Sequence, residues 1–154
     1  MASIDDLTSP EFVLLDLTAA DPRGAVEEMA GLLERNGRVT DRRAYVDAVM
    51  AREEETGGTG MESGIAIPHA KSPAVTRPAI AFARSTRGLD FGAEDGTPAD
   101  LVFLIAAPEG ADELHVKMLS RLARRLIHEE FRTRLRRAAS PEEIVAVIRE
   151  EVEL

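Results

Sequence analysis

The stretch LVFLIA at residues 101–106 is apolar at every position. A strand with one face in water alternates apolar and polar side chains, so an unbroken apolar run of this length indicates a strand that is buried on both faces. We therefore expect a central strand over residues 100–107. A second apolar run at residues 78–84 predicts its neighbour, and the glycine-containing segment 88–98 between the two predicts a loop.

The chain after this central strand is helical in pattern. Apolar side chains recur at helical spacing over residues 108–127, again from about residue 130 to 138, and finally over residues 141–152. Ser140 and Glu143 form a capping box, in which each residue satisfies a backbone amide of the other, and this box predicts the start of the last helix.

The chain before the central strand contains two further helices. Asp21, followed by a proline, predicts the start of the first, and Gly37 predicts its end. The second begins at Thr40 or Asp41 and ends within residues 52–55. Elements that alternate in this way predict an α/β fold with three layers, α/β/α, in which helices flank a central mixed β-sheet.

The remaining N-terminal segment divides into an arm and a strand. Residues 1–10 are short and polar and read as an N-terminal arm, and the apolar run 11–17 reads as the first strand. The chain has 154 residues, of which 44% are hydrophobic. This is enough apolar material for one core but not comfortably for two, so we expect residues 11–154 to form a single domain.

Composition excludes several classes of function. The chain has no cysteine, which excludes disulfides, thiolate metal sites and a cysteine nucleophile. The net charge of -9 opposes binding to nucleic acids or anionic membranes and favours a basic protein partner. No apolar stretch is long enough to span a membrane, so we expect a cytoplasmic protein without direct membrane insertion.

His69 comes after a glycine-rich loop and a short strand. Residues 57–64 contain four glycines and cannot hold a helix, and residues 65–69 read IAIPH, a strand that we expect to be stopped by Pro68. Backbone amides of such a loop can approach an anion. Spacing alone leaves His69 open between a functional residue and one that is merely exposed.

The other two histidines lie on predicted helices. His115 shares a stripe with Leu119, Leu122 and Leu126, and periodicity alone favours a core histidine with a hydrogen bond. His128 shares its helix face with the cations at positions 117, 121 and 124 and belongs to the solvated side, so we exclude it as a site residue.

Arg52 stands near the end of the second predicted helix. There it either stabilises the negative end of the helix dipole or clamps a phosphoryl group, for which the planar guanidinium is well shaped. Periodicity leaves both interpretations open.

Known nucleotide, hydrolase and metal motifs are absent from the sequence. The glycine-rich loop is not GxGxxG and has no Walker lysine, Ser63 does not lie in GxSxG, and no histidine belongs to an HExxH or HxH pair. We therefore expect neither a cofactor nor a metal ion.

One segment is specific enough to suggest a family. TGMESGIAIPH at residues 59–69 resembles the signature TGxxxGIAIPH of the type 2 enzyme IIA proteins of the sugar phosphotransferase system (PTS), the fructose/mannitol family. The likeness continues in order at residues 89–96, 101–108 and 115–126. It covers residues 11–152 and is most like the fructose-specific proteins.

This resemblance implies roles for three residues. His69 corresponds to the phosphorylated histidine, His115 to the second active-site histidine, and Arg52 to the arginine of the family's Arg-Glu pair, as a charge stabiliser. Amides of the loop at residues 59–64 are expected to add hydrogen bonds to the phosphoryl group.

The resemblance also implies partners. The phosphoryl donor is HPr, and the acceptor is a cysteine of an enzyme IIB, which serves the membrane component IIC. Two alternatives remain: a nitrogen-related enzyme IIA that regulates partner proteins through its phosphorylation state, and a small binding domain that is not phosphorylated.

Overall fold

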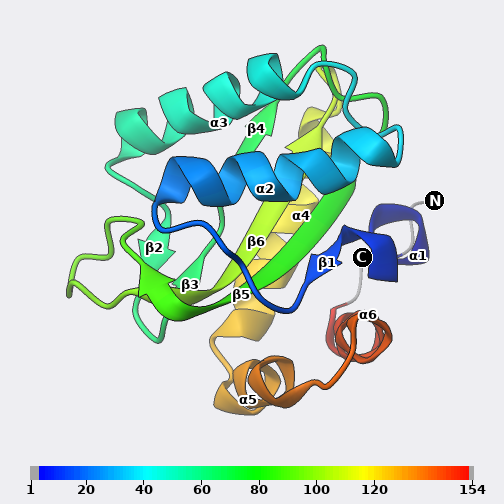
Figure 1. Cartoon of the computed structure of the whole chain (residues 1–154). Helices are drawn as coiled ribbons and strands as arrows, with labels where there is room; N and C mark the ends of the chain where they lie inside the picture. Colours follow the sequence, from blue (N-terminus) through cyan, green and yellow to red (C-terminus); the bar gives the residue numbers. More distant parts are fainter. Residues whose placement is uncertain (1–3, 153–154) are drawn as a thin grey trace.

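The computed structural model describes residues 4–152, apart from the side chain of Asp112, and their strands form one mixed sheet (Figure 1). β6 (Ala99–Ala107) pairs antiparallel with β5 (Ala79–Leu89) on one side and parallel with β3 (Ile65–Ala66) and β4 (His69–Lys71) on the other. The predicted central strand is thus confirmed. The short strands β1 (Val13–Leu14) and β2 (Gly60–Met61) close the two ends of the sheet.

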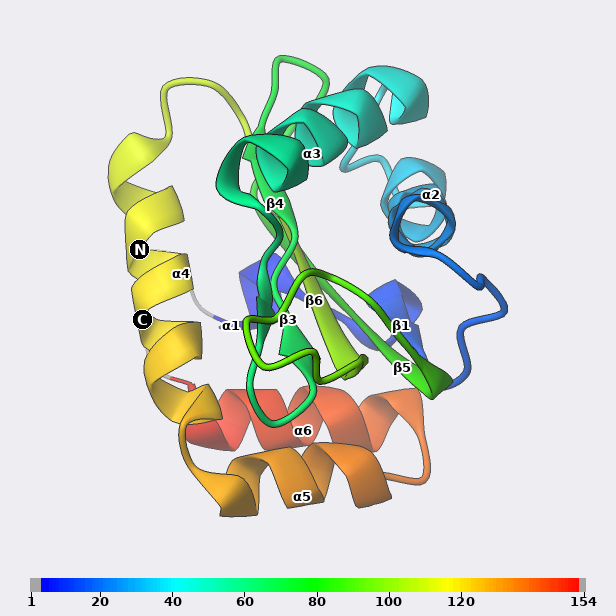
Figure 2. The ribbon, with the colours of Figure 1, turned by 90° about the vertical axis from the view of Figure 1, so that its left-hand side faces the viewer.

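Helices cover both faces of this sheet, as expected. α2 (Pro22–Arg35) and α3 (Arg42–Thr56) lie on one face, and α4 (Asp112–Leu126), α5 (Glu129–Arg137) and α6 (Pro141–Glu151) lie on the other (Figures 1 and 2). β6 supplies Val102, Leu104 and Ala106 to the core under α2 and α3, and the alternating residues Leu101, Phe103 and Ile105 to the other core. This alternation explains why β6 is apolar throughout.

The helix N-caps predicted at Asp21, at Thr40 or Asp41, and at Ser140 are present, the second of them at Asp41. The side chains of Asp21, Asp41 and Ser140 accept hydrogen bonds from backbone amides three residues further on, at 2.7, 3.0 and 3.1 Å. α3 ends at Thr56, one residue beyond the predicted range, because Gly57 adopts a left-handed conformation with φ of 81°.

The strand that carries His69 is interrupted rather than stopped. β3 and β4 pair with β6 in the same register, with Ile65 opposite Leu101 and His69 opposite Ile105. Between them, Pro68 has no N–H to donate, but its carbonyl accepts from the Ile105 amide at 3.0 Å. His69 therefore begins a second strand segment, and the prediction that it ends the strand was wrong.

The N-terminal segment packs against the domain wherever it is described. α1 (Ile4–Leu7) buries Ile4 and Leu7, which lie three residues apart on one helix face. The first strand is shorter than residues 11–17, since Pro10–Phe12 form a 3-10 turn and only Val13–Leu14 pair. Residues 1–3 of the predicted arm lie outside the described residues.

Within residues 4–152, no helix combines the length and apolar character that crossing a membrane requires.

Candidate active site

His69 is half-buried at the start of β4, and its hydrogen bond reveals its tautomer. Its Nδ1 lies 2.8 Å from the carbonyl oxygen of Ile67. Because a carbonyl oxygen only accepts, Nδ1 is the nitrogen that carries the proton, and Nε2 keeps its lone pair. The bond spans Pro68, whose fixed backbone angle helps to hold the ring in one orientation.

The surroundings of His69 favour the neutral ring. Burial lowers the pKa of the His69 imidazole below its ordinary value of 6.5, because the charged ring is poorly solvated there. The hydrogen bond to Ile67 raises the pKa, while the positive charge of Arg52 lowers it, and the net direction is downward. At neutral pH the Nε2 lone pair is therefore available as a nucleophile.

His115 meets His69 at the edge of the sheet. It lies in the first turn of α4 with 6% of its surface exposed, and the two ring centroids are 5.3 Å apart, with the planes tilted by 48°. Figure 2 looks onto this edge, with α4 on one side of β4 and α3 on the other. His115 belongs to the buried stripe of α4, as periodicity predicts. Its ring packs against the ring of His69.

One residue of the predicted stripe is more exposed than expected. Met118, Leu122 and Leu126 are buried with His115, whereas Leu119 is only partly buried. His128, by contrast, is exposed at the start of α5, as the helix pattern predicts.

Arg52 reaches the site from the opposite layer. It is exposed on α3 just before the last turn of that helix, which packs over β4, and its charge acts on the His69 ring. No ion pair of its guanidinium is found among the side chains that the structure describes. The three predicted site residues, from α3, β4 and α4, thus converge at one sheet edge.

The glycine-rich loop is fastened by its backbone. A Cβ on Gly58 would lie 2.0 Å from the carbonyl oxygen of Phe91, so only glycine allows this approach. The Gly60 amide donates to the same oxygen at 2.8 Å, and the Thr59 amide donates to Glu53 at 3.2 Å. Two of the amides that the loop was expected to offer to an anion are therefore already engaged within the protein.

Glu53 is a buried carboxyl residue near the candidate site, and the sequence pattern was not used to predict it. It is a carboxyl residue with only 8% of its surface exposed, next to exposed Arg52 and Glu54. The signal was present in the pattern, because Glu53 continues the buried stripe of α3 that runs through Tyr45, Val46 and Val49. A charge on an apolar stripe is a reason to look for a partner.

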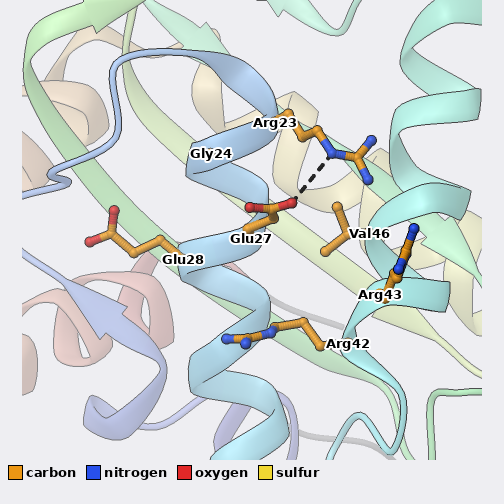
Figure 3. Close-up of a pocket in the computed structure, with 7 residues that line it drawn as sticks. All are labelled: Arg23, Gly24, Glu27, Glu28, Arg42, Arg43 and Val46. Carbon is orange, nitrogen blue, oxygen red and sulfur yellow. Dashed lines mark ion pairs between the residues drawn. The ribbon is translucent and has the colours of Figure 1, made fainter.

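A furrow between α2 and α3 lies apart from the histidines (Figure 3). It encloses about 630 Å³, and two of its arginines form ion pairs: Arg23 binds Glu27 at 3.3 Å and Asp47 at 2.5 Å, and Arg42 lies 3.8 Å from Glu34. In the part of the chain that the structure describes, no group of three or more His, Asp or Glu side chains is placed to hold a metal ion.

Comparison with known proteins identifies relatives along the whole chain. The fructose-specific EIIA component of Haloferax volcanii is 42% identical over 153 residues, which cover 99% of each chain. The fructose-specific EIIABC component of Bacillus subtilis is 42% identical over 145 residues, which cover 94% of this chain but only 23% of that protein.

Solved structures share the fold. The nitrogen regulatory protein IIA-Ntr of Neisseria meningitidis superposes with a TM-score of 0.85 at 31% identity, covering 94% of this chain and 98% of that one. Enzyme IIAMTL of Escherichia coli, solved in complex with phosphorylated enzyme IIBMTL, gives 0.76 at 26% identity, covering 92% and 98%. The model of the EIIA 2 family of the phosphoenolpyruvate-dependent sugar phosphotransferase system matches residues 6–151, and the chain belongs to that family.

Proposed function

We propose that this protein is a phosphocarrier that accepts a phosphoryl group from phospho-HPr on Nε2 of His69 and transfers it to a cysteine of an enzyme IIB. The observation that carries the proposal is the bond from Nδ1 of His69 to the Ile67 carbonyl, which leaves Nε2 as the nucleophilic atom beside His115. Membership of the phosphotransferase family supports the same chemistry.

In the first step the Nε2 lone pair of His69 forms a bond to phosphorus in line with the nitrogen of the donor phosphohistidine. The donor N–P bond breaks, and its electron pair stays on the donor ring. The phosphorylated His69 ring carries positive charge and keeps the proton on Nδ1, so its bond to Ile67 becomes charge-assisted and stronger.

In the second step a thiolate of enzyme IIB forms a bond to the same phosphorus. The Nε2–P bond then breaks, and the electron pair returns to Nε2, which restores the neutral ring. Both transfers pass through a loose transition state whose charge is spread over three equatorial oxygens, so the protein acts mainly by positioning and electrostatics.

His115 and Arg52 are the groups that offset this charge. His115 is held in place by burial in α4 and offers a ring beside His69 for a hydrogen bond to a phosphoryl oxygen. Arg52 is exposed on the other side of β4, where its guanidinium can meet the phosphoryl group as a partner delivers it.

The relatives support a choice of partners and substrate class. The two relatives at 42% identity are named fructose-specific, and IIAMTL is solved with IIBMTL, so we assign this chain to a fructose-type system with an enzyme IIB as the acceptor. Val116, the residue after His115, is 63% exposed and gives the docking partner an apolar contact next to the site. The transfers take place in the cytoplasm.

Reconstitution with phosphoenolpyruvate, enzyme I and HPr tests the proposal. Intact-mass analysis is expected to show the addition of one phosphoryl group to the wild type and none to His69→Ala, with His128→Ala phosphorylated as the wild type. An unmodified wild type, or an unchanged addition in His69→Ala, would refute the assignment and favour a binding domain without phosphotransfer.

A regulatory role is the second candidate, because the IIA-Ntr structure is also a close match. This role uses the same phosphorylation of His69 and differs in the fate of the phosphoryl group. A phosphorylated form that transfers to no fructose-type enzyme IIB domain would favour regulation.

A further inference from the structure

The carboxyl group of Glu53 ties the end of α3 to the loop that leads to His69. Its Oε1 accepts the Thr59 amide at 3.2 Å, across the turn formed by Gly57 and Gly58. This bond joins the last turn of the helix to the residue just before β2. The remainder of the loop is held by the close approach of its glycines to Phe91, so Glu53 is the side-chain link between helix and loop.

The second half of this contact is also polar and buried. Glu53 Oε2 and the Thr59 hydroxyl are both shielded from solvent, and neither forms a well-directed hydrogen bond within the described part of the chain. Burial raises the pKa of Glu53, and the side chain and amide of Thr59, which favour the ionised form, offset this rise only in part. A hydroxyl donates and a carboxylate oxygen accepts, so these two atoms are natural partners for each other.

Burying a carboxyl group in order to join two segments costs free energy. Desolvation opposes its charge, and an apolar side chain on the same stripe as Tyr45 and Val49 would pack without that penalty. The carboxyl group fixes the relative position of the two segments, because it accepts a hydrogen bond only from a donor at the correct place. The residue before it in the helix is Arg52, whose charge acts on His69.

We propose that Glu53 is a positioning residue for phosphoryl transfer, which holds the last turn of α3 on Thr59 so that the Arg52 guanidinium stays at the His69 site. This inference rests on the proposed function. Without the tie, the last turn of α3 ends beside a left-handed Gly57 and is free to fray, and Arg52, the residue just before that turn, moves with it.

Two substitutions separate the reach of Glu53 from its charge. Glu53→Asp keeps the charge but is one methylene too short to meet Thr59, whereas Glu53→Gln keeps the reach and an acceptor oxygen. We expect Glu53→Asp to slow phosphorylation of His69 by phospho-HPr about 10-fold and Glu53→Gln to stay within about 3-fold of the wild type. Glu54→Asp makes the same change at the exposed neighbour and serves as the matched control.

A double-mutant cycle identifies the residue through which Glu53 acts. In an Arg52→Ala background, Glu53→Asp should have almost no further effect on the rate, because the group that it positions is gone. A second readout is the pKa of His69 measured by NMR titration. Displacing Arg52 raises this pKa, so Glu53→Asp should raise it toward the value in Arg52→Ala, an effect that loss of stability alone does not produce.

Three outcomes would overturn the inference. A wild-type rate in Glu53→Asp removes the positioning role, and so does a loss that multiplies with that of Arg52→Ala. An equal loss in Glu54→Asp shows a general effect of the substitution on the helix. In each of these cases the wild type is still phosphorylated on His69, whereas a wild type that is not phosphorylated refutes the proposed function and this inference together.

Discussion

At the scale of single residues, the two ring nitrogens of His69 have different roles. Nδ1 of His69 is bonded to the Ile67 carbonyl, and this bond leaves Nε2 as the atom that we propose to be phosphorylated. The bond is local, since its two residues are separated only by Pro68. The group beside the His69 ring is not local, because His115 comes from α4, which follows β6 in the chain.

The lowered pKa of His69 predicts how the reaction depends on pH. The nucleophile is the neutral ring, and a pKa below 6.5 means that protonation requires more acid than for an ordinary histidine. The midpoint of the fall in the rate of acceptance from phospho-HPr should therefore lie below pH 6.5. In Arg52→Ala the fall should move to higher pH, because a neighbouring positive charge has been removed.

NMR titration of the His69 ring measures its pKa in the absence of the partner. A midpoint above 6.5 in the wild type, or no rise in Arg52→Ala, would contradict the electrostatic description of the site.

Replacement of the second histidine tests its part in the transfer. We expect His115→Ala to fold and to slow transfer from phosphorylated His69 to enzyme IIB by about 100-fold, through loss of a donor to the phosphoryl oxygens. Single-turnover transfer measures the rate, and thermal unfolding checks the fold. His128→Ala, at an exposed histidine, is the control, and equal transfer by the two variants would remove the proposed role of His115.

At the level of elements, the site depends on how its loop and strand segments are locked. β3 and β4 keep one register on β6 despite the interruption at Pro68, so His69 is placed by the sheet and not by a free loop. The glycine-rich loop before them is pinned by Gly58 and Gly60 against Phe91. The segments that lead to the nucleophile are therefore held in place by backbone contacts.

Substitutions at two neighbouring glycines measure how much the contact between the loop and Phe91 constrains the fold. Gly57→Ala and Gly58→Ala both place a side chain at positive φ, of 81° and 109°, which costs about 1–2 kcal/mol. Only at Gly58 does the new Cβ meet backbone, at 2.0 Å from the Phe91 oxygen, so we expect a further loss of about 2 kcal/mol or more.

Chemical unfolding of the two alanine variants gives this difference directly. Similar losses of unfolding free energy would mean that the contact between Gly58 and Phe91 does not constrain the loop.

At the level of the molecule, the site lies where the two helical layers meet one edge of the sheet. α3 brings Arg52 from one layer and α4 brings His115 from the other, and β4 lies between them (Figure 2). The site therefore faces outward from the sheet edge, where a partner protein can reach it. This arrangement suits a carrier that must meet a donor and an acceptor in turn.

Partner choice is a property of this whole surface. Given phosphorylated protein and separate enzyme IIB domains, we expect transfer to a fructose-type domain to be faster than to a mannitol-type domain by about 10-fold or more. Mass analysis of both proteins tracks the phosphoryl group. Equal rates with the two domains would contradict the fructose assignment, and the absence of transfer to either would favour the regulatory alternative.

The local features of the fold were readable from the sequence because their causes are local. A cap such as Asp21 or Ser140 bonds an amide three residues away, and the apolar run of β6 records that both of its faces are covered. The error at Pro68 arose because a proline that lacks a donor was taken to end a strand. At this position β6 donates a hydrogen bond to the carbonyl oxygen of Pro68 and needs no donor from it.

The amino-acid sequence alone was enough to specify the main helices, the central strand and their layered order, since these depend on neighbours within a few residues. It pointed to His69 as the candidate nucleophile through the likeness of residues 59–69 to a known family. The folded structure was needed to show that His115 is buried against His69, that Arg52 acts on the same ring and that Glu53 is tied to Thr59. The physical reason is that these contacts join separate segments, whose distances are set by packing around β6 and not by spacing along the chain.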